Sequence, residues 1–288
     1  MKRLVSTAAL MGLLGFTPTV FAQWAPFPTK NVPKNAAGQP DLAAPAPRTA
    51  DGKPDLSGIW QAVGGGGQRG ARGANAAAAA PAAPPANAIP VASFGNAGQG
   101  FPGGKLPFQP WAEELMTKRK ADNSKDNPDA HCLPMGFLQF HNHPEPRKIV
   151  QTPDMILIIY EANSGLRQIF MDGRPLPGPD AEPWWYGYSV GKWEGDTLVV
   201  ETRNIRDGEW LDVQGSPLTS AAKVTERFRR LNYGSLEIEI TVDDPKAYTK
   251  PWTVRVNQRA LLNTELIEFI CEERDATHYV GAPSPQQQ

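Results

Sequence analysis

From residue 149 onward, apolar and polar residues alternate in short runs, a pattern typical of β-strands. The clearest run is 236–242, where Leu, Ile, Ile and Val take every second position and Glu, Glu and Thr lie between them. Because successive side chains of a strand point to opposite faces, one face of this strand is apolar and the other polar. The predicted strands are 56–61, 155–160, 166–171, 186–193, 197–202, 224–230, 236–242, 252–258 and 265–271.

Tight turns join the predicted strands, for example Glu194-Gly195-Asp196 and residues 232–234. Consecutive hairpins without intervening helices predict an all-β fold, an antiparallel meander. Such a sheet must close on itself or stack on another sheet to bury its apolar face. We therefore expect a barrel or a strongly curved sheet.

One short helix is predicted over residues 110–121. Pro110 suits the first turn of a helix, where its missing N–H has no intrahelical partner. Glu113 and Glu114 favour the N-terminal end of the helix dipole, and the basic residues 118–120 favour its C-terminal end. We expect this helix to cover one end of the barrel.

Residues 1–22 have the three parts of a cleavable secretory signal peptide. Lys2 and Arg3 form the positive region, an apolar stretch extends to about Phe16, and Val20 and Ala22 suit a cleavage site. The apolar stretch is shorter than the about 20 residues that a membrane-spanning helix needs. The prediction is a periplasmic or secreted protein, cleaved near Ala22.

The mature chain is long enough for one domain of ordinary size. A Gly-, Ala- and Pro-rich stretch interrupts it, and we predict that this stretch is disordered because it has little apolar surface to bury. The expected organisation is an extended Pro- and Ala-rich lead-in over 23–50, a single β domain over 51–280 with the disordered insertion at 64–104, and a disordered tail over 281–288.

The charge balance restricts the partners. Lys and Arg total 29, Asp and Glu total 30, and the net charge is −1. This balance argues against nucleic-acid binding, which needs a concentrated positive surface. It argues equally against electrostatic attachment to a membrane. No segment after the signal peptide is apolar enough for stable membrane insertion.

Cys132 and Cys271 are the two cysteines of the chain. In an oxidising compartment they are expected to form one disulfide. The alternative is a nucleophilic or metal-binding Cys132 acting with the neighbouring His131. Adjacent residues of an extended chain point to opposite faces, so that pairing is the less favoured interpretation.

Gly58-Ile59-Trp60, in the first predicted strand, resembles the Gly-x-Trp motif of lipocalins, up-and-down barrels that hold apolar ligands. The resemblance implies a lipocalin-like barrel whose base is closed by Trp60. It also implies that an Arg near the last strands, Arg255 or Arg259, packs across this Trp.

Several longer segments resemble a family of uncharacterised exported bacterial proteins, and the match covers nearly the whole mature domain. The segments are PDLSGIW (54–60), CLP (132–134), KIVQTP (148–153), RQIFMDGR (167–174), WEGDTLVV (193–200), VTERFRR (224–230) and DDPKAYTKPW (243–252). That family has no assigned reaction, so the resemblance implies no catalytic residues.

His141 and His143 are the best candidates for metal binding. Two His at positions i and i+2 of an extended segment project to one face, and His131 or Glu145 could add a third ligand. The alternative is a polar loop with no metal.

Glu226 and Arg167 lie on predicted strands. If both face inward, they form a candidate catalytic or ligand-anchoring pair, because a buried charge must be paired. A cross-strand salt bridge on the surface is the favoured interpretation, because charged residues are seldom fully buried. Asp172, in Asp-Gly-Arg (172–174), lies either at a cavity mouth or in an ordinary turn.

The leading hypothesis for function is an exported protein that binds a small, largely apolar or aromatic molecule without a cofactor. Candidate ligand-binding residues are Trp60, Tyr160, Arg167, Trp184 and Tyr188. Trp184 and Trp185 are adjacent and face opposite sides of a strand, so one of them suits a pocket rim.

Two alternatives remain open. One is a periplasmic hydrolase, lyase or isomerase on the same barrel that uses Asp172, Glu226 or the His141/His143 site. The other is a structural envelope module with no small ligand. No nucleophile elbow, phosphate-binding loop or HExxH sequence is present, so no known catalytic motif assigns the reaction of such an enzyme.

Overall fold

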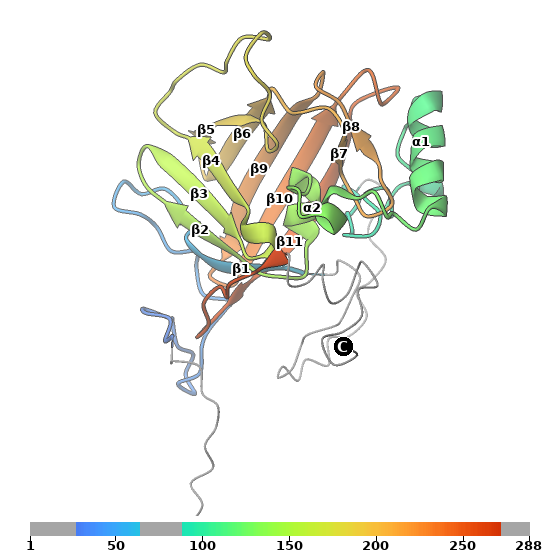
Figure 1. Ribbon diagram of the computed structural model, residues 1–288. Coiled ribbons are helices and arrows are strands. Elements are labelled where there is room, and N and C mark those ends of the chain that lie inside the picture. Colours follow the sequence, from blue (N-terminus) through green and yellow to red (C-terminus); the bar gives the residue numbers. More distant parts are fainter. Residues whose placement is uncertain (1–26, 64–87, 272–288) are drawn as a thin grey trace, which may run out of the picture.

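The computed structural model describes residues 27–63 and 88–271, and the predicted signal peptide, the stretch 64–87 and the predicted C-terminal tail lie outside these ranges. Nine strands close into one barrel, in the order β1-β11-β10-β9-β6-β5-β4-β3-β2 (Figure 1). The prediction of an all-β barrel is therefore confirmed. The barrel strands are β1 (Gly58–Val63), β2 (Arg147–Gln151), β3 (Met155–Tyr160), β4 (Leu166–Phe170), β5 (Tyr188–Glu194), β6 (Thr197–Arg203), β9 (Lys223–Asn232), β10 (Ser235–Asp243) and β11 (Trp252–Leu261).

Alternation along the strands places the core as expected. On β10, Leu236, Ile238, Ile240 and Val242 are all buried inside the barrel. β11 pairs with β10 in register, so its own alternate apolar residues, such as Val254, pack on the same interior. The core is one continuous cluster that joins the barrel interior to the segments packed on it.

One pair of strands departs from the antiparallel meander. β4 and β5 are parallel and are joined by only two residue pairs, Ile169–Ser189 and Phe170–Val190. A long loop over 171–187 connects them, so β5 starts beside the end of β4 and runs in the same direction. The β4–β5 contact is consequently the shortest backbone seam of the barrel.

The described part of the chain adds two helices and a small hairpin to the barrel. The helix predicted over 110–121 is present as α1 (Pro110–Ala121), but it does not cover the barrel end. It lies beside the hairpin of β7 (Glu209–Trp210) and β8 (Pro217–Leu218), and Ala112 is its one buried residue.

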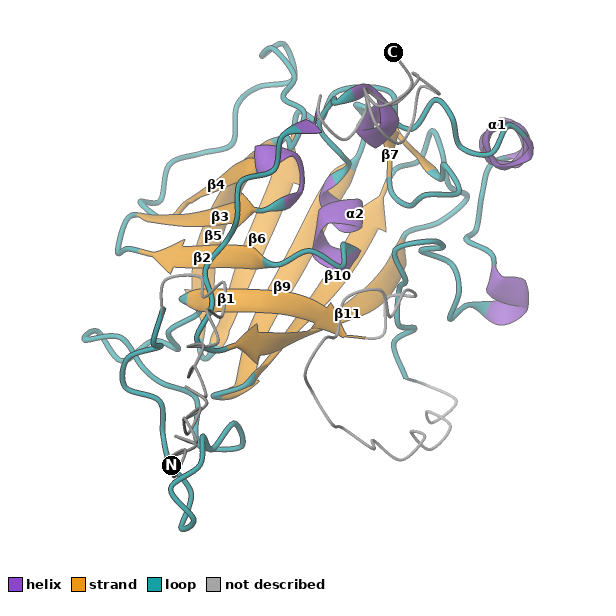
Figure 2. Cartoon of the chain, turned by 60° about the horizontal axis from the view of Figure 1, so that its bottom comes forward, coloured by secondary structure: helices purple, strands orange, loops and turns teal. Residues whose placement is uncertain are grey.

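The end of the barrel is instead occupied by α2 (Phe137–Asn142), which the sequence pattern did not predict (Figure 2). All six of its side chains are buried. Three short 3-10 helices complete the described elements, at Pro102–Gly104, Pro128–His131 and Ala162–Ser164. In the described part of the chain, no helix is long and apolar enough to cross a membrane.

The predicted disulfide between Cys132 and Cys271 is present. It ties the chain beyond β11 to the loop before α2. Residues 265–271 were expected to form the last strand, and this is wrong. Both edges of β11 are already paired, one with β10 and the other with β1, so no edge is left for a further strand.

Residues 88–104, expected to be part of a disordered insertion, pack against the barrel. Ala92 N–H donates to Arg255 O (3.0 Å), and Arg255 N–H donates to Pro90 O (2.8 Å). This short ladder covers the part of β11 that β1 does not reach, since β1 pairs only with residues 257–261. Ala97 is buried, and its N–H donates to the Asp212 carboxylate (2.8 Å).

Candidate functional site

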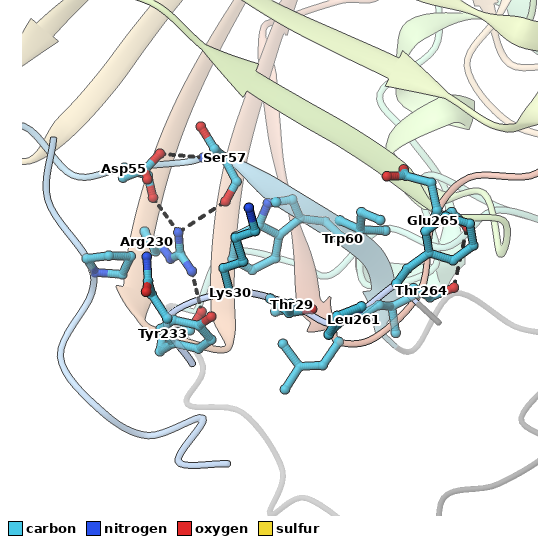
Figure 3. Close-up of a pocket in the computed structure, with 18 of the residues that line it drawn as sticks. Thr29, Lys30, Asp55, Ser57, Trp60, Arg230, Tyr233, Leu261, Thr264 and Glu265 are labelled. Atoms are coloured by element: carbon cyan, nitrogen blue, oxygen red, sulfur yellow. Dashed lines mark hydrogen bonds between the residues drawn. The ribbon is translucent and has the colours of Figure 1, made fainter. Parts of the chain in front are cut away.

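A pocket of about 720 Å³ lies at the end of the barrel where β1 begins (Figure 3). Residues 27–31, the start of β1, the β9–β10 turn and the chain around the end of β11 form its walls. The apolar part of the wall includes Phe27, Ile59, Trp60 and Leu261.

Trp60 belongs to the barrel wall at this pocket and is completely buried. Its indole N–H donates to Leu56 O (2.9 Å), which fixes the ring orientation. Gly58 has φ = +138°, a backbone conformation that L side chains rarely adopt, so this position requires Gly. The Gly-x-Trp motif therefore has a local structural reason here.

Arg230, near the end of β9, is the Arg that packs on Trp60. Its guanidinium carbon lies 4.9 Å from the Trp60 ring centroid and 5.3 Å from that of Tyr233. Its N–H groups donate to four carbonyls, those of Asp55, Ser57, Asn232 and Tyr233. Arg230 thus joins the chain just before β1 to the β9–β10 turn, as Figure 3 shows.

The expectation that Arg255 or Arg259 takes this position is wrong. Arg255 pairs with Glu237 (3.2 Å), and Arg259 donates to Gln61 Oε1 (2.7 Å). The Gly-x-Trp motif by itself does not determine which strand end lies beside the Trp. Closure of the barrel brings the end of β9, with Arg230, next to Trp60.

Residues 27–31 are held over the pocket by a reciprocal pair. Thr29 N–H donates to Asn263 Oδ1 (3.1 Å), and Asn263 N–H donates to Thr29 Oγ1 (2.8 Å). These two bonds connect segments that are 234 residues apart in the sequence. The pocket wall therefore includes a part of the chain that the sequence pattern described only as an extended lead-in.

Two of the charged residues around the pocket are neutralised by neighbours. Arg48 forms a two-bond pair with Asp196 (2.6 and 2.9 Å), and Glu265 pairs with Lys148 (2.7 Å). Among the described residues, Arg230 donates hydrogen bonds only to carbonyl oxygens, and burial lowers its pKa more than the nearby charge of Asp55 raises it. The positive charge of Arg230 is therefore not cancelled by a contacting carboxylate.

A second polar group of residues lies inside the barrel. Arg167 on β4 and Glu226 on β9 are both buried and form a two-bond ion pair; Arg167 Nη1 lies 2.9 Å from Glu226 Oε1. The interpretation of this pair as a surface salt bridge is wrong. Two strands, β5 and β6, separate β4 from β9 in the sheet, so the pair crosses the barrel interior.

Every polar atom of this ion pair has an internal partner. Arg167 also donates to Ser189 Oγ (3.1 Å) and Thr202 Oγ1 (2.9 Å), and His141 Nε2 lies 2.8 Å from Glu226 Oε1. We call these five residues the interior network. Arg167 thereby connects β4 to β5 across the short parallel seam as well as to β6 and β9.

Electrostatics keep this network in one protonation state. Burial raises the pKa of Glu226, but the charge and hydrogen bonds of Arg167, with the hydrogen bond of His141, outweigh it and lower the pKa to about 2. Burial lowers the pKa of His141 more than Glu226 raises it. His141 is therefore neutral and donates its Nε2–H to an ionised Glu226.

Both carboxylate oxygens of Glu226 already accept hydrogen bonds within the interior network, from Arg167 and His141. Tyr160, a third predicted ligand-binding residue, is also interior: it is buried, and its ring stacks on Phe140 of α2 at 4.3 Å. The network therefore works as a structural crosslink under α2.

The remaining aromatic candidates lie elsewhere. Trp184 is 41% exposed and packs at 5.2 Å on Tyr188, which stacks on Phe170 at 5.0 Å. Asp172 pairs with Arg174 beside them. The five predicted ligand-binding residues are thus divided among three places, and only Trp60 lines the 720 Å³ pocket.

The sequence interpretation missed Arg230, Tyr233 and Lys30 as pocket residues. The turn 232–234 was recognised, but nothing local indicates that it faces Trp60. One signal in the sequence could have found Arg230, namely the alternation of faces along a strand. Val224, Glu226 and Phe228 share a face of β9, and Arg230 lies on that same face.

The histidines do not form the predicted pair. His141 lies on a helix rather than an extended segment and contacts Glu226, whereas His143 pairs with Glu145. His131 Nε2 lies 3.0 Å from Lys125 O. Within residues 27–63 and 88–271, no group of three or more His, Cys, Asp or Glu side chains is placed to hold a metal ion.

Comparison with known proteins gave no family model that matches the chain and no matching curated protein.

Proposed function

We propose that this protein binds a small, largely apolar or aromatic molecule in the pocket at the Trp60 end of the barrel. The observation that carries the proposal is the pocket itself: its volume of about 720 Å³ lies within the about 300–1,000 Å³ usual for small-molecule sites. Its wall combines apolar side chains with a few polar groups, which is the usual composition of such sites.

The interior network favours a ligand site in the Trp60 pocket over a ligand site inside the barrel, because the polar groups of the network already bind one another. A ligand there would have to displace α2 and compete with Arg167 for Glu226, and a buried charge left without its partner is costly. The same argument disfavours Glu226 as a catalytic base. We further propose that the protein acts outside the cytoplasm, since the disulfide and the predicted signal peptide agree on an oxidising compartment.

Binding of a neutral fluorescent probe, 1-pyrenebutanol, tests the proposal. Leu261 lines the pocket, so Leu261→Asp places a charge in its apolar wall and should weaken binding about tenfold or more. Leu231→Asp makes the same change at a 58% exposed position of β9 outside the pocket wall, and it should bind as the unmodified protein does. Equal affinity of the two variants, both folded, would contradict the proposed site.

A further inference from the structure

We infer that the ligand of the Trp60 pocket carries one carboxylate, recognised by Lys30 and Arg230. This inference rests on the proposed function, because it concerns the chemistry of the molecule that fills the same pocket. It adds a charged end to a ligand whose body is apolar or aromatic.

The charged side chains of the pocket wall indicate an anionic group on the ligand. With Arg48 and Glu265 each paired to a partner outside the pocket wall, the charged wall residues that remain are Lys30, Arg230 and Asp55. Two are cations and one is an anion, so the pocket has an excess of one positive charge. A monovalent carboxylate balances this excess, whereas a phosphate dianion would reverse it.

Arg230 has capacity left for a ligand. A guanidinium has five N–H donors, and four are directed to backbone carbonyls. One donor on Nη2 has no acceptor among the described residues, because that nitrogen donates only to Tyr233 O (2.6 Å). Carbonyl oxygens orient the guanidinium without neutralising it, so it can still attract an anion.

Lys30 supplies the second cation of the pocket wall. It belongs to the segment 27–31, which the Thr29–Asn263 bonds hold over the pocket. The Lys30 ammonium makes no hydrogen bond or ion pair with any residue in the described part of the chain. Figure 3 shows Lys30 and Arg230 among the residues around the same space.

A matched pair of probes tests the inference. 1-Pyrenebutyrate and 1-pyrenebutanol share an apolar body and differ in the carboxylate. At low salt we expect the carboxylate to bind about fivefold more tightly, as for a partly exposed ion pair, and this preference should shrink in about 0.5 M NaCl.

Lys30→Gln should reduce the preference for the carboxylate, measured as the ratio of the affinities for the two probes, about threefold. Lys34→Gln is the matched control, because Lys34 is an exposed Lys four residues further along the chain that does not line the pocket. Equal affinities of the two probes, or an unchanged preference in Lys30→Gln, would overturn the inference while the proposed function stands. Failure of the alcohol to bind at all would instead contradict the proposed function.

Discussion

Replacing Glu226 by Gln should lower the free energy of unfolding by about 3–5 kcal/mol, because it leaves the buried guanidinium of Arg167 without a counter-charge. The shifted pKa of Glu226 agrees with this in sign and order of magnitude. The pKa of Glu226 is lowered from 4.5 to about 2, and that difference corresponds to about 3 kcal/mol. For a domain of this length, the melting temperature should fall by about 10 °C.

The sign of the pH dependence follows from the same shift. Because the folded-state pKa of Glu226 lies below its unfolded value, its stabilisation is present above about pH 4.5 and is lost as the pH falls towards 2. Neutral buried His141, whose pKa is also lowered, makes the folded state less stable as the pH falls below about 6.5. In Glu226→Gln the loss of stability between about pH 4.5 and 2 should therefore be smaller.

Urea unfolding followed by Trp fluorescence, with the disulfide intact, measures these free energies. Glu239→Gln is the matched control, since Glu239 pairs on the outside of β10 with Arg229, whose side chain is 45% exposed, and it should cost less than about 1 kcal/mol. The double replacement Arg167→Met, Glu226→Leu should cost less than Glu226→Gln alone, because no unpaired charge remains. If Glu226→Gln and Glu239→Gln cost the same, the interior network does not stabilise the barrel as argued.

Two further predictions concern stability. Glu209→Gln should stabilise the protein at pH 7–8 by about 1 kcal/mol or more, and much less near pH 4. The reason is that burial raises the pKa of Glu209 well above its usual value, so the folded state must keep the carboxyl protonated. Urea unfolding at both pH values measures this, and equal stabilisation at both would refute it. Cys132→Ser with Cys271→Ser should lower the free energy of unfolding by about 5 kcal/mol, the chain-entropy value for a loop of 139 residues. Reduction by dithiothreitol should have the same effect on the unmodified protein, and no effect on the double variant.

The strands follow from local pattern, which is why the sequence determined most of the barrel. On β10, the period of two places Leu236 and Ile238 inward whatever the neighbouring strands are. The same alternation also indicated that the interior ion pair faces inward. Glu226 shares a strand face with the buried Val224 and Phe228, and Arg167 shares one with the buried Ile169. The general rule that charged residues stay outside outweighed this local signal and led to the surface interpretation.

Only the tertiary structure decided what lies at the two ends of the barrel. α2 is six residues long, too short to form from its own propensity, and its helical form depends on burial in the barrel and on Arg147, which donates to the carbonyls of His141 and His143 (2.6 and 2.8 Å). At the other end, Lys30, Trp60 and Arg230 meet because closure places β1 beside β11 and the β9–β10 turn beside both. Periodicity specifies which face a side chain occupies, whereas the meeting of distant strand ends depends on strand order and closure, and these are properties of the whole sheet.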